Sequence, residues 1–271
     1  MAETYQSTTD DLLASFEADV LVLTMNRPER RNALSRAMLQ DMARLLEMAE
    51  ADTDVRTVVL TGAGGAFCAG GDVRAMAEGD PSDTDVDAAI HRQRISQRAT
   101  AGRLHMMPKP TLAVLPGAAA GAGLALALSC DLRIAAAGAV LTTAFAKVGF
   151  SGDYGGTYFL SQLVGTAKAR EMYFLSDRYS AEDARDMGIV NRVVDAENLM
   201  DEAMALARRL ADGPPIAYRY MKENLNRALG GDPLDCMDLE VTHHVHAGFT
   251  EDHRDAVQAF LDKRPPVFKG R

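Results

Sequence analysis

Two glycine-rich segments place small residues directly before helices, where backbone N–H groups are available to bind an oxygen. The segment AFCAGGD puts Gly71 next to the helix cap Asp72, and GAAAGAG puts Ala122 at a helix start. The first N–H groups of a helix have no partner within it, and the helix dipole favours negative charge there. If the two preceding strands are neighbours, both amides stabilise an oxygen that gains charge, as when a thioester becomes an enolate.

The small residues of the second segment have two other interpretations. They allow close packing of the helix, and the stretch from Pro110 to Cys130 has no charged residue, which a membrane span also requires. Pro116 and the glycines would break a lone spanning helix. A buried strand that leads into a buried helix explains the stretch better, so we expect no membrane partner.

One carboxylate lies in a third glycine-rich segment, GFSGDYGG. Asp153 is flanked there by Phe150, Tyr154 and glycines, so we expect its carboxyl group to be partly desolvated. Burial raises the pKa of an aspartate above its reference value of about 3.9 and makes it a better base. Asp153 is therefore a candidate for moving a proton. The alternative is a helix N-cap, a position at which aspartate is common.

The cysteines and histidines suggest no second chemistry. Cys68 has no base beside it in the sequence, so we expect it to pack in the core. The run HHVH, from His243 to His246, lacks the i and i+4 spacing of a helical ligand pair and has no acidic cluster. We therefore predict no metal site.

The length and composition are those of a globular protein. Its 271 residues are enough for one large core, and 47% hydrophobic and 25% charged residues are ordinary proportions. A net charge of −9 argues against general nucleic-acid binding. Three sparse cysteines fit a reducing compartment, and MAETYQSTTDD has no signal or transit character, so we expect a cytoplasmic protein.

Periodicity predicts the elements that must position these residues. Alternation over residues 11–25 predicts a hairpin, and Ser35 is a suitable cap for a helix over 36–50. Further strands are expected at 55–61, 111–115, 132–136 and 189–194. Further helices are expected after Asp72, at 86–106, from 157, at 167–175 and 181–187, and from 197, 215, 234 and 251, with an acidic loop at 78–84. Repeated strand, turn and helix units followed by helices indicate an α+β body with a helical C-terminal region.

At these motifs the sequence resembles the crotonase family, the enoyl-CoA hydratase/isomerase superfamily. The resemblance rests on NRPERRNALS, GAGGAFCAGGDVRAM, PGAAAGAGLALALSCDLRIA and SAEDARDMGIVNRVV, and it covers nearly the whole chain. It implies an α/β spiral of repeated ββα units over residues 1–200, which holds an acyl-CoA site, and a C-terminal helical trimerisation region over 201–271. It also implies a homotrimer or a hexamer made of two trimers, and coenzyme A as part of the substrate with no tightly bound cofactor.

The resemblance implies roles for individual residues. The oxyanion-hole amides fall on Gly71 and Ala122. The contacts with CoA fall on a basic loop, on the backbone of the first glycine-rich segment and on two further cations: Arg27, Arg30, Arg31, Ala66, Phe67, Ala69, Arg74 and Lys263. Lys263 would reach the CoA of a neighbouring subunit. The alternative for the arginines of residues 27–31 is a solvated loop.

The sequence departs from the family's hydratase pattern. Hydratases carry two glutamates, whose positions hold Ala125 and Phe145 here, so a carboxylate pair that activates water is missing. Dienoyl-CoA isomerases, oxepin-type isomerases and aryl-CoA dehalogenases carry an aspartate at the position of Asp153. The dehalogenase histidine has no counterpart near Arg98, so isomerisation ranks above dehalogenation. We expect Phe145 and Tyr154 to line the acyl pocket, and Tyr154 has the alternative role of orienting Asp153.

Three functions follow from this pattern. The first is double-bond isomerisation through Asp153, the second is hydration by Asp153 with a bound water, and the third is a catalytically idle CoA-binding subunit. The peptidases that share the spiral fold are disfavoured, because the two turns have no serine with a histidine partner near them.

Overall fold

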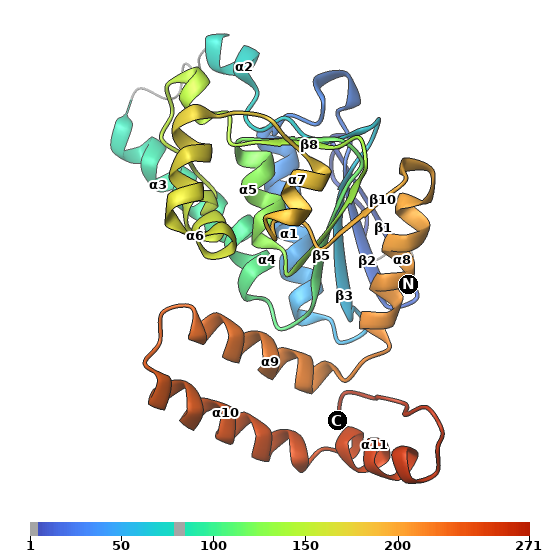
Figure 1. The fold of residues 1–271 in the computed structure, drawn as a ribbon. Helices are drawn as coiled ribbons and strands as arrows, with labels where there is room; N and C mark the ends of the chain where they lie inside the picture. The colour runs from blue at the N-terminus through green and yellow to red at the C-terminus, as the bar shows by residue number, and fades with distance from the viewer. Residues whose placement is uncertain (1–4, 79–84) are drawn as a thin grey trace.

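A six-stranded sheet forms the centre of the molecule (Figure 1). The computed structural model describes residues 5–78 and 85–271, so the acidic loop expected at 78–84 lies outside the described residues from residue 79 on. The strand order is β1 (Leu12–Glu17), β2 (Val20–Met25), β3 (Thr57–Gly62), β5 (Thr111–Leu115), β7 (Leu132–Ala136) and β10 (Arg192–Val194). The first two strands form the predicted antiparallel hairpin, and the remaining neighbours pair in parallel.

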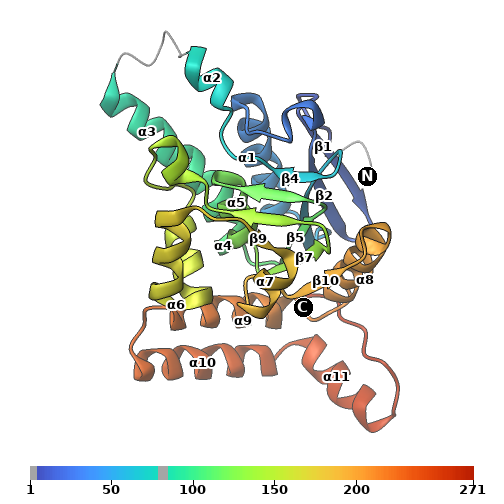
Figure 2. The same cartoon turned by 45° about the horizontal axis from the view of Figure 1, so that its top comes forward.

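A second sheet of four short strands lies against the first. It consists of β4 (Ala66–Cys68), β6 (Ala118–Ala120), β8 (Val140–Thr142) and β9 (Tyr179–Ser180). Figure 2 shows these strands running across those of the large sheet. The prediction that the segments before the helices are turns was incomplete, because each carries a strand of three residues. These two strands show too little alternation to be recognised in the sequence.

Helices cover both sheets, and two of them begin a few residues after the small-sheet strands β4 and β6. In chain order they are α1 (Arg36–Ala51), α2 (Val73–Glu78), α3 (Val86–Gln97), α4 (Arg103–Met106), α5 (Ala122–Ser129), α6 (Gly156–Leu175), α7 (Ala181–Asp186) and α8 (Leu199–Ala211). The hydroxyl of Ser35 accepts a hydrogen bond from Met38 N and caps α1 as predicted. Gly165, with φ 75° and ψ 163°, breaks α6 into the two helical segments that the sequence predicted.

Burial explains the uncharged stretch that had suggested a membrane span. All eight residues of α5 are buried, and the strand β5 before it is buried along its whole length. In the described part of the chain, no helix combines the length and the apolar character that crossing a bilayer demands. The predicted long helix over 86–106 is real, but residues 98–102 within it form a π-helical turn that the sequence did not indicate.

The hydrophobic core lies on both faces of the large sheet. One cluster joins the two sheets to α1, α5 and α6, and it includes Leu60, Phe67 and Leu126. A smaller cluster fills the other face of the sheet under α8, which contributes Ala203 and Ala207. The expected domain boundary at 200/201 therefore falls inside a helix that packs on the sheet.

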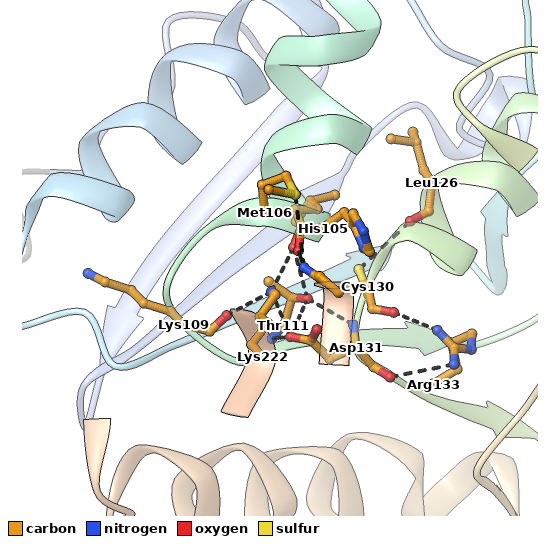
Figure 3. Close-up of polar contacts among 11 residues, drawn as sticks. His105, Met106, Lys109, Thr111, Leu126, Cys130, Asp131, Arg133 and Lys222 are labelled. Carbon is orange, nitrogen blue, oxygen red and sulfur yellow. Dashed lines mark hydrogen bonds and ion pairs between the residues drawn. The ribbon is translucent and has the colours of Figure 1, made fainter. Parts of the chain in front are cut away.

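Three C-terminal helices extend beyond this body: α9 (Pro215–Ala228), α10 (Pro233–Gly248) and α11 (Glu251–Leu261) (Figure 1). Lys222 anchors α9 to the body, since its Nζ donates hydrogen bonds to the carbonyls of Leu104 and Lys109 and to Asp131 Oδ2 at 2.9, 3.0 and 2.8 Å (Figure 3). The same Asp131 oxygen accepts from Thr111 N at 2.7 Å. One buried cation thus joins α9, α4 and the start of β5.

Candidate active site

The two glycine-rich segments lie side by side because β4 and β6 pair in parallel. A Cβ atom added to Gly70 would lie only 3.3 Å from the backbone nitrogen of Ala122. The Gly70 carbonyl accepts a hydrogen bond from Leu34 N at 2.8 Å, which fixes the orientation of this backbone. Outside the helices and strands of residues 5–78 and 85–271, no backbone hydrogen bond is donated by Gly71 N–H or Ala122 N–H, so both amides are candidates for binding an oxygen.

The close approach of these segments requires glycine. A Cβ atom added to Gly123, on the first turn of α5, would lie 2.4 Å from the carbonyl oxygen of Cys68 on β4. Gly70 has φ +90°, a conformation that costs an L-residue free energy because of its Cβ atom. Small residues in both segments therefore let the start of α5 contact the backbone of the first segment. This agrees with the interpretation that the small residues allow close packing of the helix.

Asp153 occupies a tightly folded loop directly before α6. Its carbonyl accepts a hydrogen bond from Gly156 N at 3.0 Å, but the N-cap position belongs to Gly155 and no side chain caps the helix. The alternative interpretation of Asp153 as an N-cap is therefore wrong. The Oδ1 atom is buried and has no hydrogen-bond partner among the described residues. Burial raises the pKa of this carboxyl from 3.8 to about 6, which suits a group that accepts and returns a proton near neutral pH.

Three other ionisable side chains interact with Asp153. Its negative charge adds to the burial that raises the pKa values of Cys68, Tyr154 and Tyr173. Tyr173 reaches the loop from the second half of α6, and its hydroxyl would lie 2.6 Å from a Cβ atom added to Gly156. The sequence analysis missed Tyr173, because a tyrosine in a helical pattern twenty residues after Asp153 gives no signal that it returns to the same loop.

Cys68 and Asp72 have structural roles, as expected. The Cys68 thiol is fully buried and donates to the Asn32 carbonyl at 3.0 Å, and burial raises its pKa to about 12. Asp72 accepts a hydrogen bond from Arg74 N at 3.2 Å at the start of α2. Over residues 5–78 and 85–271, no three histidine, cysteine, aspartate or glutamate side chains are grouped so that they could hold a metal ion.

The predicted basic loop lies against the first glycine-rich segment. Ala69 N donates a hydrogen bond to the Arg31 carbonyl at 2.9 Å, so the loop and the segment share one surface. Arg27 forms hydrogen bonds within the chain, because its guanidinium donates to the Ala33 carbonyl at 2.7 Å and to Asp72 Oδ2 at 3.1 Å. Arg31 is exposed, whereas Arg27 supports the loop.

The remaining residues expected to contact CoA lie in different settings. Arg74 is exposed and Arg30 is half-buried, both near the segment. Phe67 is fully buried, so residues 66–69, including Ala66, offer backbone groups rather than the phenyl ring. Lys263 follows α11, at the opposite end of the molecule from α2 (Figure 1). Lys263 therefore does not meet the other predicted residues within one chain.

The sequence model of the enoyl-CoA hydratase/isomerase family matches residues 15–271. The chain belongs to this family. It is 38% identical to the 1,2-epoxyphenylacetyl-CoA isomerase of Escherichia coli over 260 residues, which cover 96% of this chain and 98% of that protein. It is 32% identical to the short-chain-enoyl-CoA hydratase of Clostridium acetobutylicum over 256 residues, which cover 94% of this chain and 96% of that protein.

Solved structures of related proteins have the same fold. A crystal structure of a putative enoyl-CoA hydratase/isomerase from Mycobacterium abscessus superposes with a TM-score of 0.90 at 35% identity, and the match covers 96% of this chain and 100% of that one. The predicted crotonase fold is therefore confirmed, and the chain is an acyl-CoA enzyme of the enoyl-CoA hydratase/isomerase family.

Within this enoyl-CoA hydratase/isomerase enzyme, the two positions assigned to hydratase glutamates lie next to the Asp153 loop but carry no carboxylate. Ala125 is buried on α5, and its Cβ lies 3.0 Å from a Cβ atom added to Gly156. Phe145 stacks on Tyr173 with ring centroids 5.8 Å apart and an interplanar angle of 8°. Both positions therefore carry apolar side chains in place of a carboxylate.

Proposed function

We propose that this enzyme moves a double bond within an acyl-CoA thioester. The thioester carbonyl accepts hydrogen bonds from Gly71 N–H and Ala122 N–H. Asp153 removes a proton from a carbon of the acyl chain, the electron pair moves toward the thioester oxygen to form an enolate, and the proton returns to a different carbon. No atom is gained or lost overall, so the reaction needs one proton carrier and no water.

The burial of Asp153 supports this proposal most directly. A carboxylate with a buried, unpartnered Oδ1 and a pKa of about 6 is charged at neutral pH and still basic enough to take a proton from an activated carbon. In this proposal the amides of Gly71 and Ala122 supply the activation, because such donors stabilise the enolate more than the ground-state carbonyl. The relative from Escherichia coli is named as an isomerase, which favours the same reaction class.

Hydration is the second candidate function. The relative from Clostridium acetobutylicum is named as a short-chain-enoyl-CoA hydratase, and a relative from Rhodobacter capsulatus at 35% identity is named as a probable enoyl-CoA hydratase. Asp153 with a bound water would then replace the usual pair of glutamates. The apolar side chains of Ala125 and Phe145 argue against it, since hydration needs one group to activate water and another to deliver a proton.

The deciding experiment follows the products of 2-enoyl-, 3-enoyl- and 3,5-dienoyl-CoA in deuterated water by mass spectrometry and NMR. We expect the double bond to migrate with uptake of deuterium, and we expect Asp153→Asn to abolish this activity while the exposed control Asp177→Asn retains it. Formation of 3-hydroxyacyl-CoA at a useful rate would instead establish the hydratase. Binding of CoA thioesters without turnover of any of them would favour a catalytically idle subunit.

The proposal includes the CoA site and the assembly. Arg31, Arg30 and Arg74 hold the phosphates of CoA, the backbone of residues 66–69 lies around the adenine, and no other cofactor is required. A homotrimer, or a hexamer of two trimers, would cover the apolar side chains exposed on the C-terminal helices: Leu234, Val241, Phe249 and Phe260. Sedimentation of the purified protein tests this assembly, and Lys263→Ala tests whether a neighbouring subunit contributes to CoA binding.

A further inference from the structure

Tyr154, the residue after Asp153, contacts the end of α3. Its backbone N–H donates a hydrogen bond to Gln97 Oε1 at 3.0 Å. Its buried phenol lies close to the side chain of Ser96, which partly offsets the rise that burial causes in the Tyr154 pKa. Gln97 and Ser96 are consecutive residues at the end of one helix, so this helix end contacts both the backbone and the phenol of a single residue in the loop.

The loop needs such support because its backbone is intrinsically unfavourable. Tyr154 has φ +49°, which places a bulky residue in the left-handed region, and Gly152 and Gly155 on either side also have positive φ values of 118° and 74°. A left-handed L-residue costs about 1–2 kcal/mol, so the loop has competing conformations of lower local energy. In addition, Asp153 Oδ1 has no hydrogen bond in the described structure that would hold the carboxyl group itself.

The helix end is oriented by the π-helical turn that follows it. None of the residues of α3 (Val86–Gln97) is buried, so the helix itself has little packing to fix its rotation. The π-helical turn at 98–102 contributes the buried Thr100, whose hydroxyl donates to the Ser96 carbonyl at 2.8 Å. Insertions of this kind change the direction of the side chains before them and often occur at functional sites.

We propose that Gln97, with Ser96, is a positioning residue that sets the place of the Asp153 carboxyl group through Tyr154. This proposal rests on the proposed function, in which Asp153 transfers the proton. Gln97 does not contact the substrate in this account. It acts by excluding the loop conformations in which the carboxylate lies too far from the acyl carbon, and a misplacement of about 1 Å can cost a factor of about 100 in rate.

Two substitutions of Gln97 separate positioning from general support. Gln97→Ala removes the acceptor, and we expect kcat to fall by about tenfold or more with little change in KM. Gln97→Glu keeps an oxygen at the same place, so we expect it to recover most of kcat at high pH. Its negative charge beside Asp153 raises the pKa of the catalytic carboxyl, so the acid limb of its pH–rate profile moves to higher pH. Gln93→Ala, an exposed glutamine one turn earlier on α3, is the matched control and should behave as the unmodified enzyme.

The pH measurement reports on Asp153 because its neighbours do not titrate in the same range. Cys68, Tyr154 and Tyr173 interact with Asp153, and the pKa of each is raised well above neutrality. The acid limb of the rate therefore follows the carboxyl group. A shift of that limb in Gln97→Glu is a signature that simple loss of stability does not produce.

Measuring Asp153→Asn in the same experiment distinguishes the positioning role of Gln97 from the proposed function of Asp153. If Asp153→Asn is inactive and Gln97→Ala retains the kcat and pH profile of the unmodified enzyme, the positioning role is refuted and the proposed function stands. If Asp153→Asn remains active, the proposed function fails whatever Gln97→Ala does. If Gln97→Ala does not fold, Ser96→Ala and Gln97→Glu decide, and normal kcat and unshifted profiles in both overturn the positioning role.

Discussion

Asp153→Asn should make the protein more stable while it abolishes the proposed reaction. In the folded protein, burial raises the pKa of the carboxyl from 3.8 to about 6, so the charged form is less favourable there than in the unfolded chain. Each unit of pKa difference between the folded and unfolded states corresponds to about 1.4 kcal/mol, so the raised pKa of Asp153 costs the folded state at most about 3 kcal/mol at pH 7. Solvent reaches part of the side chain, so we expect a gain of about 1–3 kcal/mol when the neutral amide replaces it.

Because the pKa of Asp153 is raised in the folded state, the destabilisation that it causes depends on pH in a defined direction. A carboxyl with a raised pKa destabilises the folded state fully above about pH 6, where both the folded and the unfolded chain are ionised. The penalty declines as pH falls from about 6 toward 3.8, and at pH 4 it should be roughly a fifth of its value at pH 7. The variant should therefore exceed the unmodified protein in stability at pH 7, and the two should converge at pH 4.

Thermal or urea unfolding at pH 7, 5.5 and 4 measures the difference. For a chain of this size, we expect the melting temperature to rise by about 2 °C or more per kcal/mol at pH 7. Asp177→Asn removes an exposed carboxylate and should show no such dependence on pH. Equal or lower stability of Asp153→Asn at pH 7, or a gain that persists undiminished at pH 4, would refute the argument that burial sets this pKa.

Three further predictions follow from the same structure. The isomerisation rate should fall about tenfold for each pH unit below about 6, as protonation removes the base Asp153, and a flat pH–rate profile from 5 to 8 would contradict this. Lys222→Met should cost on the order of 3 kcal/mol in urea unfolding, because it leaves Asp131 without its buried cation; no loss would mean that α9 is held by other contacts. Gly123→Ala should cost on the order of 2 kcal/mol, because its Cβ meets a backbone carbonyl at 2.4 Å. Gly138→Ala has open space and should change the unfolding free energy by no more than about 0.5 kcal/mol, and equal effects of the two would count against the packing argument.

Most of the fold follows from patterns that are local in the sequence. The hairpin over residues 11–25, the helix capped by Ser35 and the three long buried strands were all predicted, because alternation, capping and apolar runs each act within a few residues. The four short strands of the second sheet were not predicted. Each of these four strands pairs with a chain segment that is far away in the sequence, so no local pattern announces it.

The candidate site also contains residues that local patterns predicted and residues that depend on distant segments. Gly71, Ala122 and Asp153 were identified because glycine-rich turns and a lone carboxylate stand out in a sequence. Tyr173 and Gln97 were missed, since each reaches the Asp153 loop from a helix whose pattern is ordinary. The role of Gln97 could be recognised only from the structure, in which a π-helical turn follows it. No local rule predicts such a turn from the sequence.

The physical demands on Asp153 explain why its positioning falls to a neighbour. A hydrogen bond donated to the carboxylate would fix its position, but it would also favour the charged form and lower its pKa. The structure leaves Oδ1 without such a donor, and the pKa stays near 6. The side chain must then be placed through the backbone, and the N–H of the next residue, Tyr154, donates a hydrogen bond to Gln97. The unpartnered Oδ1 of Asp153 and the hydrogen-bonded backbone of Tyr154 are thus two consequences of one requirement, which is a base that is both well placed and weakly solvated.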